Sequence, residues 1–359
     1  MNIQYRIIKV DPGCHGVLVR YFTDKVTEMD LASSFNEDGS IKLNADGYPL
    51  STRTDIMMSI YETPTPTPEE LDKRIMINAP VDWLKLQEDI KNPKPDAKCF
   101  MPWPLAETSF HFRPGEVTVY AGSNGGGKSL ITGQIALSLI KQKQKVCIAS
   151  FEMKPRKTIY RMLRQFTGED LENPLIKDKA IYFKSALDRF KKFSEDKLWL
   201  YDQQGTITTS QIIAVTRYCA IELGIQHMFI DSLMKCMKAE DDYNAQKAFV
   251  DELTSIARDH NMHVHLVHHI RKLGNQELMP SKTDLKGSGA IADQVDNVLL
   301  MHRNKKKEHD ISQGKEVPDS LPDAYLMCEK QRNGEVEDWY NLYYHKDSQQ
   351  FIEDENGMP

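Results

Sequence analysis

One glycine-rich segment constrains this chain more than any other. A β-branched run, EVTVYAG, leads directly into GSNGGGKS and then into a helical pattern. The spacing GxxxxGKS between a strand and a helix predicts a phosphate-binding loop, because glycines let backbone N–H groups close around phosphate oxygens. The loop residues are Gly122, Ser123, Asn124, Gly125, Gly126, Gly127, Lys128 and Ser129.

Two side chains of this loop predict the cofactors. Lys128 is placed to supply a cation to the β- and γ-phosphates of ATP, and the Ser129 hydroxyl can ligate Mg²⁺ at the start of the helix. Downstream, the apolar run IQHMFIDS ends in Asp231, where nucleotide hydrolases present the carboxylate that organises the metal. We therefore expect ATP and Mg²⁺, with Ser129 and Asp231 on the metal side.

Two further strand ends supply candidates for hydrolysis. KVCIASFE ends in Glu152, which could orient the attacking water or accept its proton. His269 follows the apolar part of HVHLVHHI, where a polar γ-phosphate sensor is expected. A metal site built from His263 and His265, which would share one face of a strand, is the alternative. Neither Cys, Asp nor Glu stands nearby to complete such a site.

The polar stretch RKLGNQELMPSKTDLKGSGA is too hydrophilic for the core and too long for a plain turn. Lys272 and Lys286 carry charge, and Gly287 and Gly289 allow backbone N–H groups to approach phosphates closely. A sequence-independent grip on a DNA backbone and a solvated surface loop both remain open from these residues.

A hairpin signal closes the pattern, since AYLMCEKQRNGEVEDWYNLYYH contains two strand-like runs around Asn333-Gly334. Lys330 and Arg332 stand just before the turn. They are either a solvated strand edge or a cation that reaches the nucleotide of a neighbouring subunit, as arginine fingers do.

The order of these segments predicts an α/β fold with a mainly parallel central sheet over residues 107–359. Residues 1–61 alternate apolar and polar side chains and contain turn-rich stretches, which predicts a small β-rich domain. Prolines recur through ETPTPTPEE and KNPKPDAKCFMPWP, so residues 62–106 are expected to be a linker with short helices.

Charge and composition restrict the environment. Residues 1–91 hold 10 Lys and Arg against 15 Asp and Glu, so much of the net charge of −6 lies there and this end is a poor candidate for gripping phosphates. The six cysteines are scattered and suggest neither a zinc site nor a disulfide framework. Long apolar runs and a leader-like start are absent from the sequence, which favours a cytoplasmic protein without a membrane partner.

Taken together, the segments GSNGGGKS, SFEM, FIDS, HHIRK, DLKGSGAI and KQRNG resemble, in order, the motor domain of DnaB- and Twinkle-type replicative DNA helicases. DLKGSGAI and KQRNG discriminate most, because RecA-type recombinases lack them. The resemblance implies a RecA-like core, Glu152 as catalytic glutamate, His269 as sensor, and Arg332 as a finger acting in trans beside Lys330. It also implies that Lys286, Gly287 and Gly289 contact DNA, and that Arg303 and Tyr344 stack on the nucleotide base.

By resemblance, the chain is expected to be a hydrolase that forms a homo-hexameric ring on single-stranded DNA and moves 5′ to 3′. The primase modules and the helical front domain of the family are not recognisable, so the acidic N-terminal unit is expected to dock a primase, loader or polymerase. A phage replication setting suits this layout. The alternatives are a filament-forming RecA-like recombinase or related DNA-dependent ATPase, and a nucleotide-switched helicase loader.

Overall fold

The structure is a computed structural model that describes residues 4–9, 17–22, 98–176, 178–202, 207–237, 242–271, 278–285 and 290–354. Near the start of the chain, β1 (Gln4–Lys9) and β2 (Val17–Phe22) form a two-stranded sheet. These are the two runs whose alternation predicted strands. The helices predicted within the linker lie outside the described residues.

A nine-stranded sheet organises the described part of the motor region, in the order β13-β12-β11-β10-β5-β9-β8-β6-β7. Neighbours from β10 to β7 pair in parallel, whereas β10, β11, β12 and β13 pair antiparallel in succession. The mainly parallel sheet predicted from the sequence is confirmed, with an antiparallel extension at one edge. The strands are β5 (Val117–Gly122), β6 (Val146–Ser150), β7 (Leu198–Tyr201), β8 (His227–Asp231), β9 (His263–Val267), β10 (Asn297–Arg303), β11 (Ala324–Gln331), β12 (Trp339–His345) and β13 (Gln350–Ile352).

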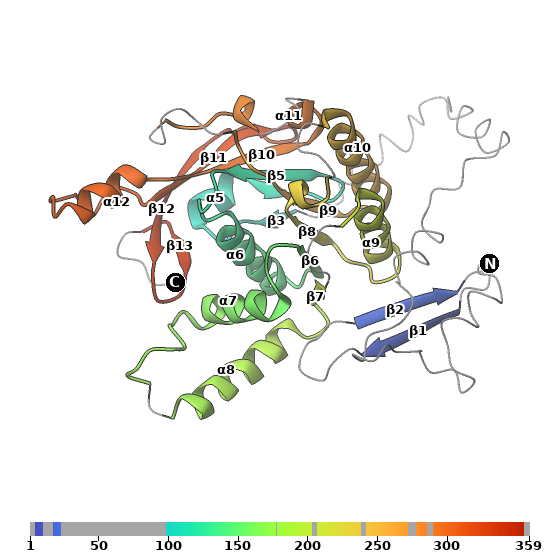
Figure 1. Ribbon diagram of the computed structural model, residues 1–359, viewed down its shortest axis with the longest axis horizontal. Coiled ribbons are helices and arrows are strands. Elements are labelled where there is room, and N and C mark those ends of the chain that lie inside the picture. The colour runs from blue at the N-terminus through green and yellow to red at the C-terminus, as the bar shows by residue number, and fades with distance from the viewer. Residues whose placement is uncertain are drawn as a thin grey trace, which may run out of the picture. The chain divides into compact units, whose positions relative to one another are not determined.

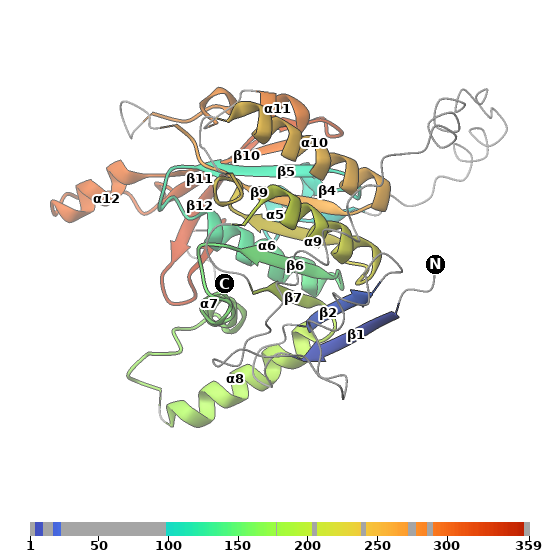
Figure 2. The same ribbon diagram turned by 45° about the vertical axis from the view of Figure 1, so that its right-hand side comes forward.

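Helices cover both faces of this sheet, with α5 to α8 on one side and α9 to α11 on the other (Figures 1 and 2). The short strands β3 (Cys99–Phe100) and β4 (His111–Phe112) form a separate pair. The helices are α5 (Pro104–Ser109), α6 (Lys128–Lys141), α7 (Pro155–Thr167), α8 (Lys179–Ser194), α9 (Thr209–Ile221), α10 (Tyr243–His260), α11 (Ala290–Gln294) and α12 (Lys305–Ser312), with single turns at η1 (Leu233–Lys235) and η2 (Lys282–Asp284).

Local sequence explains these elements. Every residue of β5, β6, β8 and β9 is buried, because parallel strands covered on both faces need continuous apolar runs rather than alternation. α7 has Pro155 in its first turn, where no N–H partner is lost, and it ends at Gly168 in the left-handed conformation. Thr208 and Gln211 form a capping box that starts α9.

The core joins the two ends of the motor region. Trp103, in the segment before α5, is buried and donates its indole N–H to the carbonyl of Phe351 in β13 at 2.8 Å. Gln134 of α6 both donates to that carbonyl and accepts from the Phe351 N–H. The described core therefore includes residues that precede residue 107. The boundary between linker and motor domain at residue 107 stays a prediction.

Three histidines of β8 and β9 are buried in the core; they are His227, His263 and His265. His263 and His265 share one face, as strand alternation predicted, with ring centroids 4.5 Å apart. His227 Nδ1 lies 3.1 Å from His265 Nε2, and His265 Nδ1 lies 2.9 Å from the Tyr120 hydroxyl. The rings are thus satisfied by hydrogen bonds inside a packed core.

Candidate nucleotide site

The glycine loop leaves β5 through backbone that tolerates no side chain at its first position. A Cβ added at Gly122 would lie 2.4 Å from the Met301 carbonyl oxygen on β10. Gly127 has φ +93° and immediately precedes α6, and a Cβ there would lie 3.0 Å from the Phe351 ring. The loop conformation therefore depends on glycine both for space and for backbone angle.

Lys128 and Ser129 begin α6 and point toward the strand ends. The buried Lys128 ammonium donates to the carbonyls of Gly122 and Ser123, each at 2.9 Å. Ser129 donates its hydroxyl to Asp231 Oδ2 at 2.8 Å. The serine and the carboxylate are therefore side by side, as the sequence predicted for the metal side of the site.

Burial sets the electrostatics of this cradle. Burial lowers the pKa of Lys128, while the negative charges of Asp231 and Glu152 act in the opposite direction and raise it. Burial also raises the pKa of Asp231, against the stabilising hydrogen bond from Ser129. An arriving phosphate would restore a counter-charge to Lys128, and a cation beside Asp231 would favour its ionised form.

Glu152 and His269 come from different strands and meet at the same sheet edge. Ser150 pairs with Asp231 in register, and the Phe151 N–H donates to the Asp231 carbonyl, so Glu152 follows directly beside the metal side. Glu152 Oε1 lies 3.9 Å from His269 Nε2, and its side chain is 40% exposed. An accessible carboxylate at this edge can reach a water that faces the phosphates.

Arg303 and Tyr344 approach the loop from the antiparallel side of the sheet. Arg303 Nη1 lies 3.4 Å from the Gly125 carbonyl, and its Nε donates to Glu308 of α12. The Tyr344 ring contacts the Phe351 ring at 5.4 Å between centroids, and Phe351 in turn lies against Gly127. Both residues predicted to stack on the base are therefore close to the glycine loop.

Arg161 of α7 belongs to this region and was not predicted. Burial lowers its pKa, while the nearby charges of Asp231 and Tyr344 act in the opposite direction. A second cation besides Lys128 therefore lies within electrostatic reach of Asp231. The sequence offers no signal for it, since Arg161 is one of several basic residues on an amphipathic helix.

Lys330 and Arg332 lie at the opposite edge of the same strands. Lys330 lies one residue before the end of β11 and pairs with Val298, whereas the strand end that leads into the loop, Gly122, pairs with Met301. Arg332 Nη1 donates to Asp296 Oδ1 at 3.0 Å, and Asp296 precedes β10. The structure does not bring these two cations to their own subunit's glycine loop.

The connection in this hairpin is longer than a tight turn. Asn333 and Gly334 do lie between β11 and β12, but the strands are separated by residues 332–338. The predicted DNA-contacting residues lie outside the described residues; they are Lys272, Lys286, Gly287 and Gly289.

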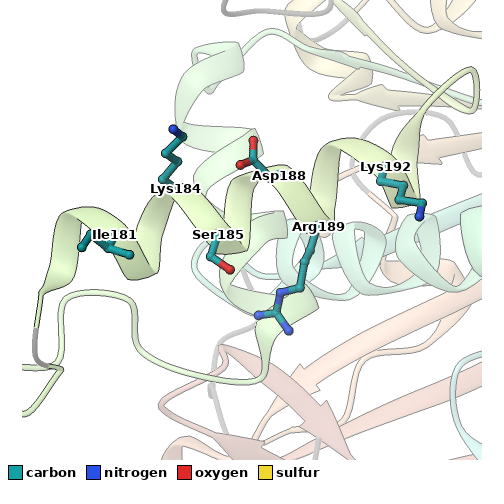
Figure 3. A pocket seen from close by; sticks show the side chains of 6 residues that line it. All are labelled: Ile181, Lys184, Ser185, Asp188, Arg189 and Lys192. Carbon is teal, nitrogen blue, oxygen red and sulfur yellow. The ribbon is translucent and has the colours of Figure 1, made fainter.

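A separate hollow follows α8, away from these residues (Figure 3). Lys184 and Asp188 project from one side of the helix, and Ser185 and Arg189 from another, so their polar groups do not converge (Figure 3). All of its lining residues belong to α8; they are Ile181, Lys184, Ser185, Asp188, Arg189 and Lys192. We assign it no part in nucleotide binding.

The residues at the loop fit Mg²⁺ better than a tightly ligated transition metal. Within the described ranges, no group of three or more His, Cys, Asp or Glu residues is arranged to hold an ion. A hydroxyl and one carboxylate suit Mg²⁺, which usually keeps several waters and uses phosphate oxygens as further ligands. Ser129 and Asp231 are such a pair. Across the same ranges, the structure contains no helix that is both long and apolar enough to cross a membrane.

The parallel sheet, the glycine loop and the acidic strand ends define a nucleotide-binding motor domain of the RecA-like class. Residues 105–353 match the family described as the DnaB-like helicase C-terminal domain. The chain belongs to that family.

Similar proteins agree with this assignment. The chain is 25% identical to the DNA helicase/primase of Enterobacteria phage T3, over 56% of this chain and 38% of that protein. It is 26% identical to the replicative DNA helicase DnaB of Helicobacter pylori, over 62% of this chain and 52% of that protein. The matches thus span about half of these relatives or less.

Solved structures show the same fold. One solved ATPase domain superposes with a TM-score of 0.61 at 16% identity, covering 75% of this chain and 96% of that one. A DnaB-like replicative helicase, studied for its interactions with primase, superposes with a TM-score of 0.60 at 15% identity, covering 75% and 65%. The RecA-like helicase fold predicted from the motifs is confirmed.

Proposed function

We propose that this chain is an ATP-dependent DNA helicase that translocates on single-stranded DNA as a homo-hexameric ring, moving 5′ to 3′. Membership of the DnaB-like family supports the reaction class. In the proposed cycle, the glycine loop would hold ATP, and Ser129 and Asp231 would hold a Mg²⁺ ion that supplies positive charge to the phosphates. Glu152 orients the attacking water, and His269 senses the γ-phosphate.

The position of Arg332 is the observation that supports the proposed ring. The nucleotide residues occupy the carboxyl edge of the parallel strands, whereas Arg332 is tied to Asp296 at the amino edge of the same strands. Phosphoryl transfer in such motors needs a cation to neutralise charge that develops on the γ-phosphate. Because Arg332 does not face its own loop, we assign it, together with Lys330, to the nucleotide of a neighbouring copy.

The polar residues that follow β9 are assigned to DNA binding in this proposal. Lys272, Lys286, Gly287 and Gly289 would contact the DNA backbone without reading its sequence. Arg303 and Tyr344 would hold the base, because Arg303 contacts the loop and Tyr344 contacts Phe351, which lies against Gly127. By analogy with a relative named helicase/primase, the acidic N-terminal region would dock a primase, loader or polymerase in the cytoplasm of a bacterial or phage-infected cell.

The decisive experiment measures unwinding of a forked duplex by the purified full chain with ATP and Mg²⁺. We expect unwinding only when the fork carries a free 5′ single strand. Electron micrographs with DNA and nucleotide should show closed rings, and filaments would instead indicate a recombinase. Nucleotide binding without any unwinding would indicate a loader.

A mixing experiment tests the shared site. Inactive Arg332→Ala subunits added to wild-type protein should lower DNA-stimulated hydrolysis by more than simple dilution, because each defective subunit disables a neighbour's nucleotide. Strictly proportional loss would argue against action in trans.

A further inference from the structure

The two residues proposed to hold the base share one face of the antiparallel side of the sheet. Arg303 and Leu342 both pair with Ala324 of β11, so their side chains point to the same face. Tyr344 follows Leu342 by two residues and therefore shares that face as well. β10 ends at Arg303, and the pairing of β12 with β11 stops at Leu342. Residues outside these three strands therefore bear on how both side chains are held.

Helix α12, which follows Arg303, is polar and extends away from the helices that cover the sheet (Figures 1 and 2). Asn304 caps its start by accepting the Lys307 N–H at 3.0 Å, and donates from its side chain to the Pro322 carbonyl at 3.0 Å. Lys307 is 8% exposed and is the buried residue of this helix. Because a lysine is rarely buried without a partner, polar contacts rather than an apolar face fix α12 in place.

Glu308 of α12 contacts Arg303 directly. Arg303 donates from its Nε to Glu308 Oε1, and its Nη1 lies 3.4 Å from the Gly125 carbonyl of the glycine loop. The N–H groups of a guanidinium lie in its plane, so partners along its edge leave its faces available for stacking on a ring. Glu308 can therefore fix the direction of the Arg303 plane and leave open the surface that a base would use.

Lys307 is linked to Tyr344 through Asp323. The Lys307 Nζ lies 2.9 Å from Asp323 Oδ1, and Asp323 Oδ2 accepts the Tyr344 N–H at 2.7 Å. The same ammonium donates to the Leu321 carbonyl and lies 5.9 Å from the centroid of the Tyr343 ring. One carboxylate thus connects the buried ammonium of α12 to the backbone of β12 at Tyr344.

We propose that α12 sets the geometry of the base pocket, with Glu308 as the positioning residue for Arg303, and Lys307 and Asp323 as those for Tyr344. This inference rests on the proposed function, which assigns Arg303 and Tyr344 to the base. Lys307 and Glu308 are consecutive residues of one short helix, so a single element holds both sides of the pocket. α12 would then contribute to affinity for the base and not to affinity for the phosphates, which the glycine loop would hold.

The test measures equilibrium binding of two probes, ATP and inorganic tripolyphosphate, each with Mg²⁺ and the full chain. Tripolyphosphate offers the phosphates without a base, so the ratio of the two dissociation constants reports the contribution of the base. A change of charge near the phosphates acts on both probes and largely cancels from this ratio. We expect the wild-type chain to bind ATP more tightly than tripolyphosphate.

Two variants should reduce this preference for ATP. Glu308→Gln removes the charge and keeps the shape of the side chain. The Arg303 side chain is 46% exposed and that of Glu308 43%, so solvent weakens their interaction and the preference should fall only about 2- to 5-fold. Lys307→Met keeps a buried side chain of similar length but leaves Asp323 without this partner. The preference should then fall about 5- to 10-fold.

Asp310→Asn is the matched control. Asp310 lies on the same helix but forms its ion pair with Lys315, at 2.6 Å, so this variant should keep the wild-type preference. A double variant separates action through Arg303 from a general effect on the helix. In an Arg303→Gln background, Glu308→Gln should cause no further loss, because its effect is transmitted by Arg303. A further loss of the same size would overturn the assignment of Glu308.

The outcomes distinguish the inference from the proposed function. An unchanged preference in both Glu308→Gln and Lys307→Met would overturn the inference, as would an equal fall in Asp310→Asn. Glu308 is exposed, so its variant is expected to fold even where Lys307→Met does not, and an unchanged preference in it is then sufficient. Failure of the wild-type chain to unwind a fork, with its preference for ATP intact and dependent on α12, would instead overturn the proposed function alone.

Discussion

Ser129 donates its hydroxyl to the Asp231 carboxylate at 2.8 Å, although 102 residues separate them in the chain. The contact joins the first turn of α6 to the end of β8. It depends on the parallel sheet, because β8 and β5 both end at the edge where α6 begins. The fold itself thus brings together the two residues that we propose as the metal side of the site.

Glu152→Gln should separate binding from hydrolysis. The amide keeps the shape of the side chain but cannot accept a proton from water, so turnover should fall about 10²- to 10⁴-fold. Nucleotide affinity should change little, because Glu152 is accessible and holds no loop residue in place. Equilibrium binding and steady-state hydrolysis measure the two effects. Glu222→Gln, an exposed carboxylate at the end of α9, is the control. Undiminished DNA-stimulated turnover in Glu152→Gln would refute its assignment.

Tyr344→Ala should weaken nucleotide binding more than it slows hydrolysis. The ring lies beside Phe351, which itself lies against Gly127, and in this position it is proposed to stack on a base. Loss of one stacking contact should raise the KM for ATP about tenfold, with a smaller change in kcat. Tyr344→Phe keeps the ring and should retain the wild-type KM. An equal loss in both variants would show that the hydroxyl, and not the ring, is needed.

Comparing Gly127→Ala with Gly125→Ala separates the steric effect of an added Cβ from the cost of a positive φ. Both glycines have positive φ, but a Cβ at Gly125 meets nothing within 4 Å, whereas one at Gly127 meets the Phe351 ring. Positive φ alone should cost about 1 kcal/mol of unfolding free energy at either site. Gly127→Ala should lose more stability, and more nucleotide affinity, because β13 must also move. Denaturant unfolding with and without ATP checks the order, and equal losses would contradict the proposed contact.

The buried histidines predict loss of stability in acid. Burial lowers the pKa of His263 to about 4, and its Nδ1 donates to the Arg113 carbonyl at 2.7 Å. The unfolded chain binds a proton near pH 6.5 and the folded chain only near pH 4, so unfolding free energy decreases as pH falls through that interval. The full effect is about 3 kcal/mol, reached below the lower value.

Unfolding curves at several pH values between about 7 and 4 measure this effect. His263→Gln removes one titrating group, so its unfolding free energy should depend less steeply on pH than that of wild type. Parallel pH profiles for the two proteins would show that His263 does not contribute. The slope is the relevant quantity, since the substitution also changes stability at neutral pH.

The sequence predicted those parts of the site that are encoded locally. A strand, a glycine loop and a helix occur in one segment, and the strand-end acids Glu152 and Asp231 follow apolar runs, so parallel pairing brings them together. Strand alternation likewise placed His263 and His265 on one face. These inferences need only periodicity and the rule that parallel strands end at one edge.

Residues that contribute through distant packing could not be predicted. Arg161 comes within electrostatic reach of Asp231 only because of how α7 packs, and Phe351 reaches Gly127 from the far end of the motor region. Asp296 precedes an apolar strand as many acids do, and its role as acceptor for Arg332 depends on the register between β10 and β11. Periodicity carries no information about such pairings.

The packing of Phe351 also bears on when the protein acquires its ligand during biosynthesis. The strand that carries Phe351 contacts Trp103, Gln134 and Gly127. The glycine loop therefore lacks this packing until the ribosome has released that strand. A nascent chain that already contains GSNGGGKS would bind ATP poorly. We therefore expect nucleotide to bind, and hydrolysis to begin, only once the motor region is complete.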